Sequence, residues 1–502
     1  MSPGLKSSRV LLLAVVFFVA AAIPRFVALN EQSLWNDEMY SLRVASLPLS
    51  EIPRQLNEAY FHPPLYFVLL HFMVKWFGIS EWSLRFLSAL FGSLTVAVLS
   101  LVTRSMFDER AGIWASLFCL IAPFHIAYSQ EARPYALAGF FCLLSLFALY
   151  QAWTTKRDSC YFFYIIVTAL ALYTHHWVIF LIAIQVAFIV TDGILRRESL
   201  KLPMLSWLTI AVLYLPLVGT LFYQTQKVFH SPWWWAERAS PIHLLWTDLA
   251  FSGVYFKLAS SIFESTLPVE VVGGAITFLL LAFALWAGMK QNARVSLIIL
   301  FSLFGTLGLA FVGSTARPET YLWYRYPVIL FPLFCIVITL GLNVIRTPSL
   351  RLVVAGVLIG LMSVSTFRYY HWSKANAKSV VALVETVAST RTDVVIRPWY
   401  FADLFNYYYH GQARQVEEGA YDSTIGPGIQ HVDQFVLITF DIPNEVRDYI
   451  DTHFEKVFEQ RFPGEAHMGI IVGVYRKGIS SSAPASLTLP MPSTESFDRG
   501  KS

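Results

Sequence analysis

Long apolar runs separated by short polar loops occupy the chain from its start to about residue 367. Most of these runs approach the roughly 20 residues that a helix needs to cross a bilayer. The pattern therefore predicts an all-α polytopic membrane protein with about eleven transmembrane helices. The runs are 10–29, 84–103, 112–127, 135–153, 160–174, 177–194, 203–222, 268–288, 295–313, 326–345 and 351–367.

The stretch Pro64–Gly78 is also apolar but shorter, and it decides the predicted topology. If it does not cross, the N-terminus and every basic loop fall on one side, which the positive-inside bias makes cytoplasmic. We therefore expect 64–78 to be a juxtamembrane helix in the outer interface. The N-terminal run resembles a signal peptide, but we expect an uncleaved first helix because many spans follow it. The basic loops are 104–110, 154–159, 192–202, 289–294 and 346–351.

Two larger outer segments follow from this topology. Residues 30–83 contain the adjacent carboxylates Asp37 and Glu38 just after the first span. Residues 223–267 contain three consecutive tryptophans, Trp233 to Trp235. Because Trp favours the membrane–water boundary, we expect amphipathic helices in this second segment.

The pattern changes after the last apolar run, where short helical and strand-like stretches alternate. Following a membrane domain over 1–367, residues 368–478 are predicted to form a small extracytoplasmic α/β domain. A Ser/Pro-rich tail over 479–502 is expected to be disordered. The predicted helices are 380–390, 402–410 and 445–458, and the predicted strands are 392–398, 434–440 and 468–476.

Composition agrees with a membrane protein. The chain is 56% hydrophobic and 14% charged, whereas a soluble domain carries roughly 25% charged residues. A net charge of +4 is too mild to indicate nucleic-acid binding, and basic membrane-facing loops account for it. The cysteines lack metal-type spacing and are interpreted as small core residues. They are Cys119, Cys142, Cys160 and Cys335.

Unusual polar residues gather on the predicted outer side, at one membrane depth. A carboxylate pair at this boundary is costly unless something solvates, pairs or uses it. We expect one outward-facing polar site to hold the whole set. Its candidate members are Asp37, Glu38, His62, Arg85, Glu131, Arg133, His175, His176, Arg325 and Tyr326.

Each candidate has a structural alternative beside its functional interpretation. Asp37 and Glu38 are either solvated loop carboxylates or the source of a general base. Glu131 and Arg133 also fit a local ion pair that caps helix ends.

The histidines and the remaining arginines are equally open. The pair His175–His176 is more typical of an interface than of a metal site, because adjacent residues on a helix point in different directions. Arg85 and Arg325 either snorkel to the interface or bind a lipid phosphate, whose oxygens match the guanidinium fork.

Taken together, short motifs in residues 1 to about 345 resemble bacterial family 39 glycosyltransferases. These belong to the GT-C superfamily, with protein O-mannosyltransferases and the aminoarabinose transferases of lipid A. The motifs are Trp35-Asn36-Asp37-Glu38, His62-Pro63-Pro64-Leu65-Tyr66, Glu81-Trp82-Ser83-Leu84-Arg85, Tyr128-Ser129-Gln130-Glu131-Ala132-Arg133-Pro134-Tyr135 and Arg325-Tyr326-Pro327.

The resemblance implies a polyprenyl-phosphate-sugar donor, inverting transfer, and an active site on the extracytoplasmic side of the inner (plasma) membrane. The acceptor would be a cell-envelope glycolipid, a glycan or a protein. By the same resemblance Asp37 is the base, Glu38 orients the acceptor, and Arg85 and Arg325 lie near the donor phosphate. Some relatives bind a divalent cation at the acidic site, although no strong metal-ligand spacing is visible here.

The resemblance also places Glu131 and Arg133 on the wall of the site, and leaves the role of the histidine pair open. A transporter or flippase for a lipid-linked or small anionic substrate is the competing class, since charged groups in a membrane also outline substrate paths. A sensor or assembly protein would use the outer α/β domain but would give Asp37 and Glu38 no task.

Overall fold

The computed structural model describes residues 3–59, 62–230, 279–284, 286, 293–316, 325–371, 376–397, 401–417, 433–439, 450–462 and 470–477. The chain divides into two compact units, Met1–Lys374 and Ala375–Ser502. The sequence placed the boundary at 367/368, but the last membrane helix continues to His371.

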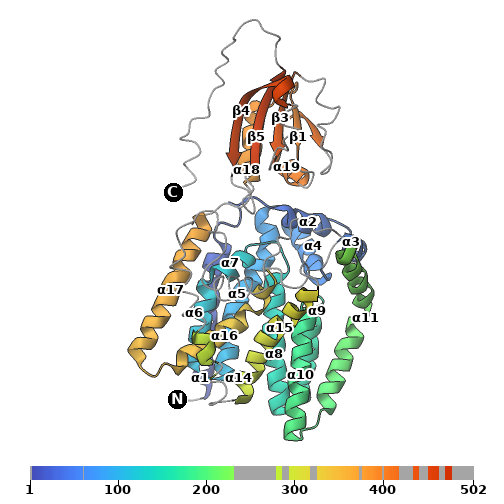
Figure 1. Cartoon of the computed structure of the whole chain (residues 1–502). Helices are drawn as coiled ribbons and strands as arrows, with labels where there is room; N and C mark the ends of the chain where they lie inside the picture. The colour runs from blue at the N-terminus through green and yellow to red at the C-terminus, as the bar shows by residue number, and fades with distance from the viewer. Residues whose placement is uncertain are drawn as a thin grey trace. The chain divides into compact units, whose positions relative to one another are not determined.

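The first unit is helical throughout its described residues (Figure 1). A π-helical turn, Phe301–Gly305, joins α14 to α15, and a 3-10 turn, Tyr326–Leu330, precedes α16. The helices are α1 (Pro3–Phe26), α2 (Asn36–Ala45), α3 (Ile52–Ala59), α4 (Leu65–Phe77), α5 (Glu81–Met106), α6 (Glu109–Ile121), α7 (Pro123–Ser129), α8 (Tyr135–Thr155), α9 (Asp158–Leu172), α10 (Val178–Arg196), α11 (Lys201–His230), α14 (Ala293–Leu300), α15 (Thr306–Ala316), α16 (Phe331–Val344) and α17 (Pro348–His371).

The predicted polytopic helical class is confirmed, and the chain is a multi-pass membrane protein. Within the described ranges eight helices are long and apolar enough to span a membrane, or nine if α6 and α7, bent by 63°, form one span. The sequence predicted about eleven. Of the other predicted spans, 160–174 corresponds to the shorter helix α9, and 268–288 lies largely outside the described residues.

Helix α4 is the apolar stretch that decides the topology. Its 13 residues extend about 20 Å at 1.5 Å per residue, which is less than the roughly 30 Å of a hydrocarbon core. Figure 1 shows α4 beside α2 at the end of the unit away from the N-terminus. This arrangement suits a helix that packs on the bundle without crossing.

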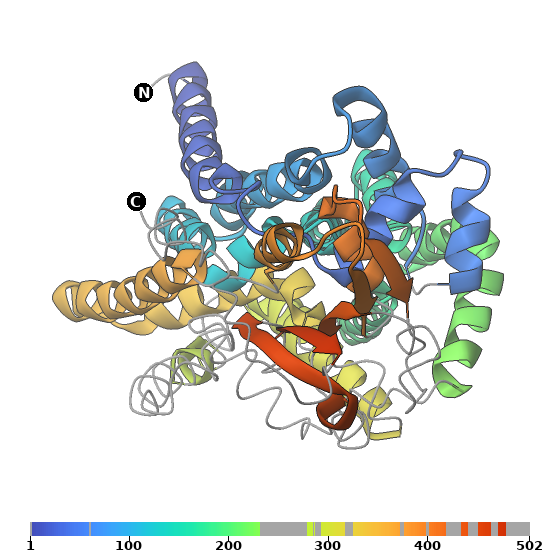
Figure 2. The same cartoon turned by 90° about the horizontal axis from the view of Figure 1, so that it is seen from above.

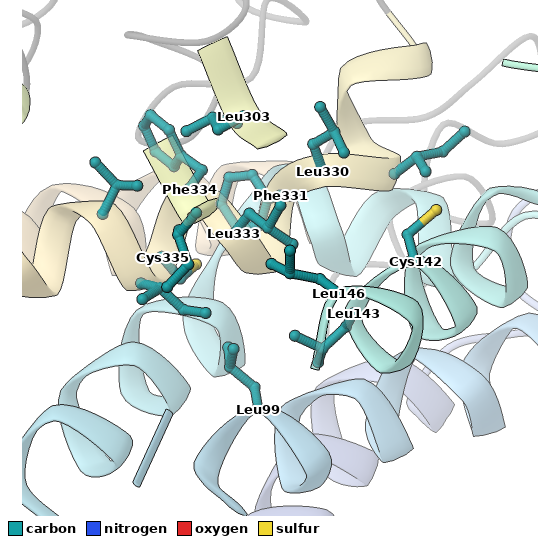
Figure 3. Close-up of a cluster of buried hydrophobic side chains, with 14 of the residues drawn as sticks. Leu99, Cys142, Leu143, Leu146, Leu303, Leu330, Phe331, Leu333, Phe334 and Cys335 are labelled. Atoms are coloured by element: carbon teal, nitrogen blue, oxygen red, sulfur yellow. The ribbon is translucent and has the colours of Figure 1, made fainter. Parts of the chain in front are cut away.

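The core of the membrane unit forms where α5, α8 and α16 pack together. Leu99 of α5, Leu143 of α8 and Phe334 of α16 are all buried in one apolar cluster (Figure 3). By contrast, α1 and α17 are only 22% buried over their most apolar windows and lie at the edge of the unit in Figure 2. Their outward side chains, such as Leu11 and Leu352, are exposed, as lipid-facing residues must be.

At the end of the bundle opposite α2 and α4, a group of ion pairs links three connections: the one between α8 and α9, the one between α10 and α11, and the one that precedes α14. Arg294, next to the start of α14, contacts Asp192 of α10 at 2.6 Å and Glu198 at 2.8 Å. Lys156 reaches Glu198 at 2.5 Å, and its ammonium lies over the Trp153 ring. These residues come from the basic loops that the sequence places on the cytoplasmic side.

The second unit contains a five-stranded sheet in the order β2-β1-β3-β5-β4. Strand β1 is parallel to β2 and β3, whereas β5 is antiparallel to β3 and β4. Helices α18 (Ala377–Val387) and α19 (Ala402–Tyr408) accompany it. The strands are β1 (Asp393–Ile396), β2 (Arg414–Glu417), β3 (Gln434–Thr439), β4 (Phe454–Phe462) and β5 (Ile470–Lys477).

Two local predictions in this unit need correction. The helix expected over 445–458 is wrong from Phe454 onward, where β4 begins. Phe454 is buried against Phe435 of β3, and β4 pairs along its length with β5. That long-range pairing outweighs a helical pattern of local charges. The strand β2 was also missed, because four mostly polar residues give no periodic signal.

Candidate active site

The site is built around the first turn of α2. Trp35 has an extended backbone before the helix, and Asn36, Asp37 and Glu38 form its first turn. Acidic side chains are favourable at a helix N-terminus because they face its exposed N–H groups. Neighbouring residues on a helix point about 100° apart, so Asp37 and Glu38 meet different surroundings.

Glu38 is fully buried and forms a two-pronged ion pair with Arg85 of α5. The two carboxylate oxygens accept from Arg85 at 2.8 Å and 2.7 Å, and the guanidinium is only 2% exposed. Arg85 also donates to the backbone carbonyls of Leu29, Gln32 and Ser33. The pair therefore anchors the loop between α1 and α2 onto α5.

Asp37 faces the other way and remains 35% exposed. Its Oδ2 atom accepts from Arg325 at 2.5 Å and lies 3.8 Å from Arg133. The Arg325 guanidinium also sits 4.2 Å from the centre of the Trp35 ring. Among the described residues, Oδ1 has no ion pair or hydrogen bond, so one oxygen of this carboxylate is clamped and the other is available.

From Asp37 the contacts continue through a closed circuit, which we call the polar ring. Arg133 donates to His62 Nε2 at 2.7 Å. The His62 ring lies 4.8 Å from His175, and His175 lies 5.0 Å from Tyr326. Tyr326 follows Arg325, which returns to Asp37. The polar ring thus comprises Asp37, Arg133, His62, His175, Tyr326 and Arg325.

The side chains of His175 and His176 point in different directions, as expected for adjacent residues. His175 is buried in the polar ring, and His176 Nδ1 meets the hydroxyl of Tyr214 on α11 at 2.7 Å. Burial and the nearby Arg133 lower the pKa of His62 well below 6.5. Burial and the neighbouring His176 do the same for His175, and burial lowers the pKa of His176 to about 4. These imidazoles are therefore neutral at pH 7.

The segment that carries Glu131 and Arg133 is held by backbone contacts. Gln130 donates to the carbonyls of Pro24, Arg25 and Val27 at the end of α1. The backbone N–H of Ala132 donates to Glu38 Oε1 at 2.9 Å. Glu131 is buried, and its backbone carbonyl accepts from the N–H of Arg133 at 2.8 Å. These contacts fix the position from which Arg133 reaches Asp37.

Sequence reasoning missed the buried residue Arg25, which stabilises the bend between α6 and α7. Its guanidinium donates to the carbonyls of Cys119 and Leu120 and to His125 Nδ1 at 2.9 Å. A single arginine near the end of the first apolar run was the available signal. Helix α7 leads into the segment 130–133. Arg25 therefore helps to fix the position of that segment, although it is not a member of the polar ring.

Two predicted roles do not match this geometry. Arg85 was expected near a donor phosphate, but its guanidinium is buried and committed to Glu38 and three carbonyls. Glu38 was expected to orient the acceptor, yet it is 0% exposed. Both residues hold the frame of the site, because a buried charge needs a paired partner.

The donor set around Asp37 does not fit a divalent cation. Two guanidinium groups flank the carboxylate, and a third positive charge at the same oxygen is unfavourable. Among the residues that the structure describes, no cluster of three or more His, Cys, Asp or Glu side chains has a metal-binding arrangement.

Comparisons with known proteins show which proteins this chain resembles. A family model described as dolichyl-phosphate-mannose-protein mannosyltransferase matches residues 61–223. A protein of Aquifex aeolicus described as uncharacterized is 30% identical over 113 residues. That match covers 22% of this chain and 23% of the relative, so the chain spans less than a quarter of that protein.

Solved structures resemble the chain over most of its length. ArnT from Cupriavidus metallidurans, bound to undecaprenyl phosphate, matches with a TM-score of 0.55 and 13% identity, covering 94% of this chain and 99% of ArnT. The oligosaccharyltransferase AglB from Archaeoglobus fulgidus, in complex with an inhibitory peptide and a dolichol-phosphate, matches with a TM-score of 0.55 and 11% identity, covering 97% and 75%. The chain therefore shares its fold with these two proteins, in agreement with the predicted resemblance to the GT-C superfamily.

Proposed function

We propose that this chain is a glycosyltransferase of the inner (plasma) membrane that moves a sugar from a polyprenyl-phosphate donor to an extracytoplasmic acceptor. The observation that carries the proposal is the state of Asp37. One oxygen is held by Arg325 and the other is available beside a partly exposed surface. A carboxylate presented in this way suits a general base.

The proposed reaction inverts the anomeric carbon. An acceptor hydroxyl oxygen attacks that carbon while its proton passes to Asp37 Oδ1. The bond from the anomeric carbon to the phosphate oxygen breaks, and its electron pair stays on the lipid phosphate. Because the leaving group is already an anion-stabilising phosphate, no nucleotide-binding loop is needed.

Arg325 is the proposed partner of the donor phosphate. Its guanidinium is 13% exposed and spans the space between Asp37 and Trp35. Cationic donors that face a developing negative charge stabilise the transition state. When the donor binds, Arg325 would share its five N–H groups between the phosphate and Asp37 Oδ2.

Arg133 and the Glu38–Arg85 pair are proposed to position Asp37. Arg133 contacts the backbone carbonyl of Asp37 at 3.3 Å as well as its Oδ2 at 3.8 Å. Glu38 and Arg85 fix the first turn of α2 to α5. Rigid support matters because catalysis falls steeply when a reacting group moves by about 1 Å.

The experiment that tests the function compares transfer with transport. Purified protein in proteoliposomes receives a polyprenyl-phosphate-linked sugar and glycolipid, glycan and protein acceptors, and sugar in the acceptor is measured. A glycosyltransferase yields a new sugar–acceptor bond and free polyprenyl phosphate in equal amounts. Movement of the intact donor between leaflets, with no new bond, would support the transporter class and refute the proposal.

The unit Ala375–Ser502 is proposed to serve acceptor recognition or stability. Its described residues contain none of the candidate side chains of the polar ring, all of which precede residue 327. A truncated chain that ends before Ala375 should therefore still bind the donor. Loss of donor affinity in a well-folded truncation would contradict this division of labour.

A further inference from the structure

The hydrogen bond from Arg133 fixes the protonation pattern of His62. A guanidinium only donates, so His62 Nε2, which meets Arg133 at 2.7 Å, accepts. In a neutral imidazole the proton then resides on Nδ1. This Nδ1 atom is buried and has no hydrogen-bond partner among the described residues. His62 therefore offers a buried N–H donor that none of the described side chains or backbone groups accepts from.

His175 offers a second donor of the same kind. The backbone N–H of Trp177 donates to His175 Nδ1 at 3.1 Å, so this nitrogen is the acceptor. The proton of the neutral ring lies on Nε2, which is also buried and unpartnered within the described ranges. The two imidazole rings are 4.8 Å apart, so both donors belong to one small region of the polar ring.

Two buried N–H donors without acceptors are unfavourable unless something satisfies them. Each unsatisfied buried group costs about 1–3 kcal/mol, and His62 and His175 are only 4% and 3% exposed. The missing partner must supply oxygen acceptors. The donor phosphate is already assigned to Arg325 in the proposed function, so the partner of these two rings would come from the sugar of the donor. Hydroxyl and ring oxygens of a sugar are acceptors that meet this requirement.

We propose that the N–H groups of His62 and His175 bind oxygens of the donor sugar and select an uncharged sugar. This proposal rests on the proposed function. It places the sugar beside Arg133 and Tyr326, while the phosphate lies toward Arg325, so that the anomeric carbon is near Asp37. The ring of Tyr326, 5.0 Å from His175, adds an apolar surface beside the two donors.

The same arrangement disfavours amino sugars. A protonated amine only donates hydrogen bonds, so it would face two N–H groups and leave them unsatisfied. It would also approach the positive charge of Arg133. Sites built to bind one polar group reject analogues that lack it far more strongly than apolar pockets discriminate by size. We expect an amino-sugar donor to bind at least about tenfold more weakly than its hydroxyl counterpart.

The test measures binding of two lipids to the purified full-length protein. The first is undecaprenyl phosphate linked to a neutral hexose, and the second is undecaprenyl phosphate without sugar. The variant His175→Phe keeps an aromatic ring but removes the donor, and His175→Gln restores an N–H. We expect His175→Phe to weaken sugar-lipid binding about tenfold, with partial recovery in His175→Gln and unchanged binding of the sugar-free lipid.

Several controls keep the outcomes distinct. His371→Phe alters an exposed histidine that contacts Phe367 on α17 and should change neither affinity. If His175→Phe unfolds, His62→Phe removes the second donor and His62→Gln restores an N–H, which provides the same comparison. Equal weakening for both lipids would assign the donors to the phosphate and overturn the sugar site, as would unchanged affinity for both. Wild-type protein that binds neither lipid would refute the proposed function itself.

Discussion

Arg325 and Asp37 form a 2.5 Å ion pair across 288 positions of sequence. The pair joins the segment before α16 to the first turn of α2, so it closes the polar ring. It also puts the proposed phosphate ligand and the proposed base in direct contact before any substrate arrives. Removing either partner should therefore have separable effects on binding and on chemistry.

Replacing Asp37 by Asn keeps the size of the side chain and removes its charge. General-base contributions are typically about 10² to 10⁴ in rate, so single-turnover transfer should fall by that order while donor affinity changes little. Asp37→Glu should recover only part of the rate, because the longer side chain displaces the oxygens. Near-normal transfer by the Asn variant would remove Asp37 from the chemical step.

Arg325→Ala should lower donor affinity first, whereas Asp37→Asn lowers mainly the transfer rate. The proposed partner of Arg325, the phosphate, is charged before the reaction begins, so donor binding should weaken first, by about tenfold or more. Arg325→Lys keeps the charge but loses the fork geometry and should recover only part of the affinity. Donor affinity and single-turnover rate measured on the same preparations check this. A variant with full affinity but a lower rate would place Arg325 at the transition state alone.

Substitutions in the Glu38–Arg85 pair should lower the free energy of unfolding more than they lower the affinity for the donor. Arg85→Met leaves a fully buried carboxylate without its partner, which costs about 3–5 kcal/mol. The double variant Glu38→Leu/Arg85→Met should lose less stability than the sum of the single changes Glu38→Leu and Arg85→Met. Thermal unfolding in detergent measures the stability of the single and the double variants. If Arg85→Met unfolds like the wild type but fails to bind donor, Arg85 would be a phosphate ligand after all.

Acidification should destabilise the protein through His62 and His175. The folded-state pKa of each lies below the unfolded value of about 6.5, so the unfolded chain binds more protons below pH 6.5. Their contribution is complete above that pH and declines as pH falls, by about 1.4 kcal/mol per histidine at pH 5.5. Burial is the main cause of both lowered pKa values; the charge of Arg133 favours both neutral rings, and Arg325 favours that of His62. Unfolding midpoints at pH 7.5 and 5.5 should differ less in His175→Gln.

The topology is tested by cysteine labelling in a background without native cysteines. Ile79 is exposed and avoids Ser80, whose side chain caps α5. Ile79→Cys should react with an impermeant reagent from outside. Leu195, which is exposed in the last turn of α10, provides the matched control, since Leu195→Cys should react only after permeabilisation. The reverse pattern would invert the predicted orientation.

The sequence was most informative where charged residues lie at the outer ends of apolar runs. A charge at the membrane boundary is costly unless it is solvated, paired or used, so Asp37, Arg133 and Arg325 were predicted to share one site, and the structure brings these three together. Sequence could not tell which of the adjacent carboxylates faces inward, because that depends on where α2 packs. Arg85 was therefore paired with a phosphate when its partner is Glu38.

Long-range pairing limited the predictions elsewhere. Strand β4 was expected to be the end of a helix, and only its register with β5, which lies beyond an intervening connection, identifies it as a strand. The same holds for Arg25. Its partners His125 and Cys119 are about a hundred residues away, and no local pattern connects them.

The polar ring has a consequence for the order of synthesis. Its members come from five separate segments of the chain, and the last of them, Arg325 and Tyr326, precede α16. Since a chain emerges from its N-terminus, the ribosome has synthesised the chain through α15 before the polar ring can close. A ribosome-bound intermediate thus carries the base but lacks the cation proposed to bind the phosphate. Under the proposed function, the newly made protein would therefore gain its full donor site only after the segment with Arg325 and Tyr326 has been synthesised.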